Sequence, residues 1–278
     1  MLTIARNIDF RSRDLAALFR RRPAEDASHK KTLDLEEKRS HIIQDMARLC
    51  RAAGADVLEI GLAPRRKDAA EIMALAVSTV QQANNGQICL STQEPEALEA
   101  GIRLCRRPPI VNYVSMDTQV LQEILPLAAR HHAEVVIFPC EGQAPTDAAD
   151  FFRKAAVLVG AANEAGISND RLFIDLGVIH INSDLGQHHA QTMVEILLNL
   201  PEAFDPPLRS TCFINNISAG TPRRLRSALN NSFLALLAGA GLHSAFVDAL
   251  DRDVMRTVRL IKIFRNQLIY ADGEAELR

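Results

Sequence analysis

The strongest constraint on the fold is a repeated alternation of short apolar runs with longer amphipathic stretches. The apolar runs are rich in Val, Ile and Phe, and each is followed by a stretch with the periodicity of a helix. Runs that are apolar throughout are typical of parallel strands buried on both faces. The eight predicted strands span 2–8, 56–62, 87–90, 109–114, 134–138, 171–176, 211–214 and 244–247.

Helical patterns occupy the segments between these runs. The sequence Glu94-Pro95-Glu96 has the proline and acidic residues that favour the first turn of a helix. Gly166 and Gly241 stand where glycine caps end helices. Eight strands that each precede a helix predict a (β/α)8 TIM barrel, with residues 1–278 as a single domain. The first connection, 10–32, is longer and more charged, and we expect a lid or a capping loop there.

Composition and charge exclude several classes of protein. The formal net charge of -2 gives no general attraction to nucleic acid or to an anionic membrane. The chain shows neither a signal pattern at its start nor an apolar run long enough to span a membrane, so we expect a cytoplasmic protein. The five cysteines are scattered without a CxxC pair, which argues against a zinc site. The histidines, including His188 and His189, are expected at the surface.

Two polar residues inside apolar strands point to a functional site. Asn112 lies in PPIVNYV and Asp175 lies in RLFIDLGV. A lone carboxylate buried without partners costs several kcal/mol. Either each group is satisfied by neighbouring protein groups, or it faces a wet pocket. We favour the pocket, because the active sites of such barrels lie at the carboxyl ends of the strands.

The chemistry of these strand ends suits a planar heterocycle with several N–H and C=O groups. A carboxylate accepts two parallel hydrogen bonds, and an asparagine offers a donor and an acceptor together. No metal site is expected, since Asp175 is the only clear oxygen ligand for a metal ion among the predicted strand ends. The sequence contains neither a GxSxG elbow nor a glycine-rich nucleotide motif.

Several motifs resemble those of the pterin-binding barrel family, and within it those of the methyltetrahydrofolate:corrinoid/iron–sulfur protein methyltransferases. The similarity runs through nearly the whole chain, with the motifs in the family's order. The segments that carry it are AGADVLEI at 53–60, PEALEAG at 95–101, PIVN at 109–112, FID at 173–175 and NISAGTP at 216–222.

The resemblance implies a set of site residues. Ser91, Asn112 and Asp175 take the positions that hold the pterin ring in that family, and Asn216 takes the position that reaches N5, where the methyl group sits. The chain departs from the family pattern at three positions of its second and third predicted strands. Ser91 replaces an aspartate, Glu59 replaces another aspartate, and Gly61 replaces an asparagine.

The resemblance also implies an activity and partners. It implies an enzyme that moves a methyl group from N5 of methyltetrahydrofolate, or a related reduced pterin, to the cobalt of a corrinoid (cobalamin) carried by a partner protein. It also implies a homodimer formed through the late helices. Two alternatives stay open: a pterin-binding barrel with an altered ligand or lost catalysis, and an enzyme of pterin metabolism similar to dihydropteroate synthase.

Overall fold

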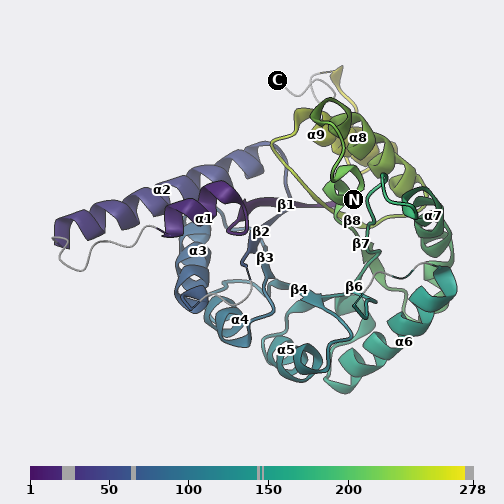
Figure 1. Cartoon of the computed structure of the whole chain (residues 1–278), viewed down its shortest axis with the longest axis horizontal. Helices are drawn as coiled ribbons and strands as arrows, with labels where there is room; N and C mark the ends of the chain where they lie inside the picture. The colour runs from purple at the N-terminus through teal and green to yellow at the C-terminus, as the bar shows by residue number, and fades with distance from the viewer. Residues whose placement is uncertain (21–28, 64–66, 143–144, 146, 273–278) are drawn as a thin grey trace.

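The computed structural model describes residues 1–20, 29–63, 67–142, 145 and 147–272, and in this part of the chain eight parallel strands form a ring (Figure 1). The ring confirms the predicted (β/α)8 barrel. Its strands are β1 (Leu2–Asp9), β2 (Val57–Gly61), β3 (Ile88–Ser91), β4 (Ile110–Val114), β5 (Glu134–Ile137), β6 (Leu172–Asp175), β7 (Arg209–Thr211) and β8 (Ser244–Val247).

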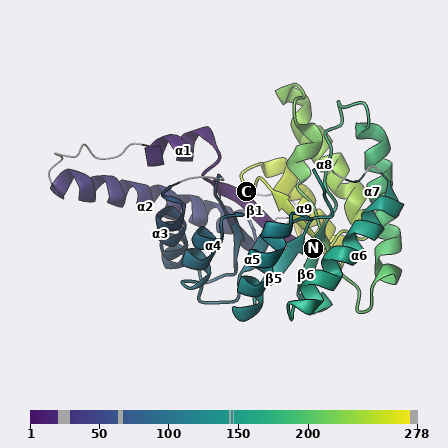
Figure 2. The ribbon, with the colours of Figure 1, turned by 60° about the horizontal axis from the view of Figure 1, so that its bottom comes forward.

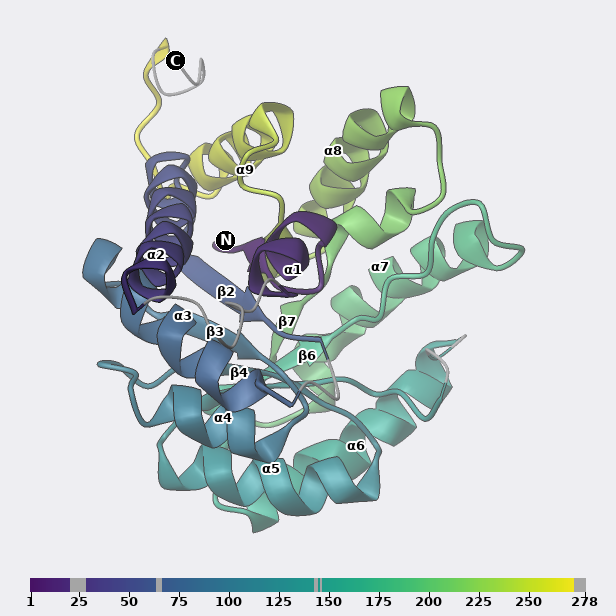
Figure 3. The same ribbon diagram turned by 60° about the vertical axis from the view of Figure 1, so that its left-hand side comes forward.

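An outer layer of helices surrounds the strands, and α3 to α6 follow one another around the outside (Figure 3). The first connection contains α1, which runs beside the long helix α2, and the start of α2 extends away from the ring (Figure 2). The helices are α1 (Arg13–Arg20), α2 (His29–Ala52), α3 (Ala69–Ala83), α4 (Pro95–Ile102), α5 (Thr118–Arg130), α6 (Ala148–Glu164), α7 (Gly186–Ala203), α8 (Arg223–Gly239) and α9 (Arg252–Phe264). Part of the predicted lid, 21–28, lies outside the described residues.

The barrel interior is built on one layer of apolar side chains. Successive side chains of a strand point to opposite faces, so every second residue faces the barrel axis. The inward-facing layer is almost completely buried and forms a cluster separate from the core between strands and helices. Its members are Ile4, Val57, Cys89, Ile110, Val136, Phe173 and Phe246.

The barrel closes at the seam between β7 and β8. The hydrogen-bonded ladder runs in the order β7-β6-β5-β4-β3-β2-β1-β8, and an isolated bridge between Phe213 and Phe246 joins its two ends. Ser210, which is fully buried, supplements that bridge. Its Oγ accepts a hydrogen bond from the backbone N–H of His243 (3.1 Å), and its carbonyl accepts one from the hydroxyl of Ser244 (3.1 Å).

The structure differs from the sequence expectations at two places. β7 ends at Thr211, and the stretch predicted to complete it leads into a 3-10 helix, η2 (Ile214–Ser218). The expectation that His189 lies at the surface is wrong, because its side chain is 2% exposed and its Nε2 lies 2.7 Å from the carbonyl oxygen of Gly177. A helical residue next to polar neighbours looks exposed in sequence, but here α7 turns it toward the β6 end.

We predict that Ser210→Ala weakens the barrel seam. The alanine removes the acceptor for the His243 N–H, and leaving a buried donor unpaired costs about 1–3 kcal/mol. Urea unfolding should show this loss, whereas Ser232→Ala, at an exposed position of α8, should change stability by less than about 0.5 kcal/mol. Equal stabilities of the two variants would contradict the role given to Ser210.

Candidate active site

A layer of polar side chains lies directly above the apolar layer of the barrel interior. Two residues further along four strands, and therefore on the same inward face, stand Glu59, Ser91, Asn112 and Asp175. None of these side chains is more than 5% exposed. The strand register thus gathers groups from β2, β3, β4 and β6 at the carboxyl end of the barrel, where barrel enzymes carry their active sites.

Ser91 and Asn112 are joined directly and line a cavity of about 180 Å³. The Nδ2 of Asn112 donates a hydrogen bond to the Oγ of Ser91. The Oδ1 of Asn112 is buried without a hydrogen-bond partner among the described residues. Tyr113, whose ring makes an edge contact with Phe138 at 5.4 Å, lines the same cavity. An unpaired buried acceptor beside a cavity is free to receive an N–H of a ligand.

Asp175 is one of two buried carboxyl groups in this polar layer, beside Glu59. Burial raises the pKa of Asp175 to about 7, and one hydrogen bond from the backbone N–H of Gly177 (3.0 Å) opposes the increase. Burial also raises the pKa of Tyr113, with smaller contributions from Cys140 and Asp175. Asp175 therefore lies near the Tyr113 side of the mouth and changes its charge close to neutral pH.

A cation faces the same cavity from the end of β1. The Nε of Arg11 lies 2.6 Å from the Oδ1 of Asp9, and its Nη2 lies 3.2 Å from the Oε1 of Glu59. Burial lowers the pKa of Arg11, but Glu59 and Asp9 together outweigh burial and raise it. Arg11 was missed in the sequence because it stands in the charged first connection, and only the closed barrel brings it beside β2.

Phe213 forms part of the cavity wall. Its ring stacks on the ring of Phe246 with centroids 4.1 Å apart and planes 7° from parallel. The guanidinium carbon of Arg6 lies 5.1 Å from the centroid of the Phe213 ring. An aromatic wall beside polar groups is typical of sites that bind flat rings.

The two asparagines after β7 lie in η2 and differ in their surroundings. Asn216 is exposed, while Asn215 is half-buried and its Oδ1 is enclosed without a hydrogen-bond partner among the described residues. Neither residue lines the cavity beside Ser91. The structure thus brings Ser91 and Asn112 into direct contact and places Asp175 on the same inward layer, whereas Asn216 lies on the rim.

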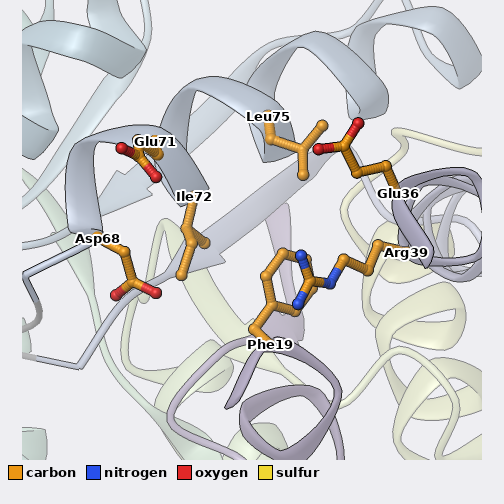
Figure 4. Close-up of a pocket in the computed structure, with 7 residues that line it drawn as sticks. All are labelled: Phe19, Glu36, Arg39, Asp68, Glu71, Ile72 and Leu75. Atoms are coloured by element: carbon orange, nitrogen blue, oxygen red, sulfur yellow. The ribbon is translucent and has the colours of Figure 1, made fainter. Parts of the chain in front are cut away.

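A second cavity, of about 530 Å³, lies outside the ring between α1, α2 and α3 (Figure 4). Figure 4 shows Arg39 lying over the ring of Phe19, with the guanidinium carbon 4.8 Å from the ring centroid. Glu36, Asp68 and Glu71 also line this cavity. Its lining residues come from α1, α2 and α3 and from Asp68 directly before α3, so its contacts attach α1 and α2 to the helical layer.

The described residues contain no group of three or more His, Cys, Asp or Glu side chains arranged to hold a metal ion. No helix in the same part of the chain is long and apolar enough to cross a membrane.

A parallel barrel whose mouth combines a carboxyl, amides and an aromatic wall has the features of a barrel enzyme for a flat, polar small molecule. The chain belongs to the family of pterin-binding enzymes, whose family model matches residues 28–248. It is also similar to the methylcorrinoid:tetrahydrofolate methyltransferase of Eubacterium limosum, with 27% identity over 229 residues that cover 81% of this chain and 82% of that protein.

Solved structures of dihydropteroate synthases share the fold. The enzyme from Vibrio fischeri superimposes with a TM-score of 0.68 at 13% identity, and the enzyme from Xanthomonas albilineans with 4-aminobenzoic acid superimposes with 0.64 at 18% identity. Each comparison covers 97% of this chain and 94% of the other. These identities are low, so the likeness concerns the barrel alone.

We predict that Asp175→Asn stabilises the free protein above pH 7. The pKa of Asp175 is raised from 3.8 to about 7 in the folded protein. Its contribution to stability is therefore present in full below pH 3.8 and is lost as the pH rises through about 7.

Urea unfolding of the wild-type protein and Asp175→Asn across this pH range measures the effect. The stability of the wild type relative to the variant should fall by up to about 1.4 kcal/mol for each pH unit in this window and stay constant above it. A difference that does not change with pH would contradict the raised pKa.

Proposed function

We propose that the chain transfers a methyl group between N5 of a reduced pterin, with methyltetrahydrofolate as donor, and the cobalt of a corrinoid carried by a partner protein. The observation that carries the proposal is the similarity to the Eubacterium limosum methyltransferase across four-fifths of both chains. That relative is named for transfer from a methylcorrinoid to tetrahydrofolate. The same residues would serve both directions, because forward and reverse reactions share one transition state.

The proposed binding mode uses the polar layer at the mouth. The ionised carboxyl of Asp175 would accept two hydrogen bonds from the amino and ring N–H groups of the pterin. The unpaired Oδ1 of Asn112 would accept a further N–H, and Ser91 would fix the orientation of the Asn112 amide. Ligand donors that favour the charged form would lower the pKa of Asp175 and release its proton at neutral pH.

Catalysis requires help at the leaving nitrogen. When the N5–methyl bond breaks, its electron pair stays on N5, which takes up one proton from solvent so that the pterin leaves as an amine. When bound, the corrinoid would supply the nucleophilic cobalt that receives the methyl group. A neutral amine nitrogen leaves poorly, so a hydrogen bond to N5 that strengthens in the transition state raises the rate. Asn216 would donate this hydrogen bond from the rim, provided that the pterin ring lies against η2.

The alternative function similar to that of a dihydropteroate synthase has weaker support. Similarity to dihydropteroate synthases is limited to the fold. The other alternative, a barrel that binds a pterin without turnover, differs from the proposal in one measurable respect, which is methyl transfer.

We predict that Asn216→Ala reduces methyl transfer by roughly 100-fold to 1000-fold, the usual effect of removing one donor to a developing charge. The dissociation constant of 5-methyltetrahydrofolate should change by less than about threefold, because the donor acts mainly in the transition state. Transfer to free cob(I)alamin can be followed by absorbance, and binding by titration calorimetry.

Asn215→Ala is the matched control for this prediction, because it removes the neighbouring amide and leaves Asn216 in place. A large loss with Asn215→Ala alone would assign the N5 contact to Asn215 instead. If the wild-type protein binds 5-methyltetrahydrofolate but transfers no methyl group, the protein is a binder without turnover. If it binds no reduced pterin at about millimolar concentration, the proposal is wrong.

A further inference from the structure

Arg11 occupies the cavity wall that faces Ser91 and Asn112. Three hydrogen bonds to two carboxylates hold it there. Its backbone N–H donates to the Oδ1 of Asp9 (2.9 Å), its Nε donates to the same oxygen (2.6 Å), and its Nη2 donates to Glu59 (3.2 Å). A guanidinium fixed by two carboxylates presents its remaining N–H groups in a defined direction.

The backbone of β2 is shaped to admit this guanidinium. A Cβ atom at Gly61 would lie 2.5 Å from the Nη2 of Arg11 and 3.0 Å from the Oδ1 of Asp9. Any side chain at position 61 would therefore displace the Arg11 and Asp9 pair. Gly61 permits the close approach of the arginine to the strand end, which is the use of glycine where groups must come near the backbone.

Some N–H groups of the Arg11 guanidinium donate no hydrogen bond to the described residues. A guanidinium carries five N–H groups and no acceptor. The hydrogen bonds between described residues use the Nε–H and one N–H of Nη2, which leaves three N–H groups. The side chain is 36% exposed, so these groups are accessible from the cavity.

The local charge decides which acceptor suits these donors. Asp9 and Glu59 face two cations, Arg11 and also Arg6, whose Nη2 lies 4.0 Å from the Oδ2 of Asp9, so the formal charges of the four groups balance. An anionic ligand brought to Arg11 would meet no excess of positive charge and would approach both carboxylates, and like charges at such distances repel. A neutral oxo group accepts the same hydrogen bonds without this repulsion.

We propose that Arg11 is a specificity-determining residue that donates hydrogen bonds to the oxo group of a bound pterin. This inference rests on the proposed function, and it adds the residue that selects a 4-oxo reduced pterin over its 4-amino analogue. An amino group at that position directs N–H bonds toward the N–H groups of Arg11, so two donors face each other and both stay unpaired. Sites built for one hydrogen-bonding pattern reject the opposite one strongly.

Titration calorimetry with tetrahydrofolate and 4-amino-4-deoxytetrahydrofolate tests the inference. The wild-type protein should bind the 4-oxo pterin at least about tenfold more tightly than the 4-amino pterin. Arg11→Met should weaken binding of the 4-oxo pterin about tenfold to hundredfold and leave the 4-amino pterin nearly unchanged, so that the selectivity disappears. Arg11→Lys keeps the charge without the planar fork and should retain part of the selectivity.

Arg103→Met is the control, because Arg103 lies at an exposed position directly after α4, where it pairs with Glu99, and does not line the cavity. It should keep the wild-type ratio of the two dissociation constants. Because Arg11→Met leaves Glu59 buried without its cation, Arg11→Met/Glu59→Gln serves as a second variant that removes both charges, and it too should lose the selectivity. Binding of both pterins with an unchanged ratio in the Arg11 variants would overturn the role of Arg11 alone. Failure of the wild-type protein to bind either pterin would overturn the proposed function as well.

Discussion

The inward-facing apolar layer of the barrel determines which side chains face inward at the mouth above it. Strand alternation requires that a residue two positions after an inward apolar side chain also faces inward. Val57, Cys89, Ile110 and Phe173 therefore direct four polar side chains to one end of the barrel. The seam at Ser210 keeps the ring closed, and without closure the groups on β2 and β6 would not face a common space.

The three departures from the family pattern on β2 and β3 lie next to one another in the structure. Gly61 leaves space for the guanidinium of Arg11, and Glu59 accepts a hydrogen bond from that guanidinium. Ser91, the register partner of Gly61 on the neighbouring strand, accepts a hydrogen bond from Asn112. The sequence presents them as separate substitutions. In the structure they form one cavity wall in which a cation stands near the position of a lost carboxylate, so we interpret them as one change in ligand recognition.

The sequence predicted the barrel, because apolar runs and helical periodicity are local properties of the chain. It also predicted the inward polar positions Asn112 and Asp175, since a polar residue within an apolar strand is visible without tertiary structure. It did not predict Arg11, whose role depends on β1 lying beside β2. It likewise extended β7 beyond Thr211, because the apolar residues before Asn215 fit a strand as well as a 3-10 turn. The assignment of the N5 contact to Asn216 stays a prediction.

The central claim is that a reduced pterin binds at the mouth with Asp175 ionised. Titration calorimetry of 5-methyltetrahydrofolate in buffers of different ionisation enthalpy measures the protons exchanged on binding. With a pKa of about 7 in the free protein, the account predicts the release of about half a proton at pH 7, declining toward zero at higher pH and absent in Asp175→Asn. Binding that exchanges the same number of protons in the wild type and in Asp175→Asn would contradict it.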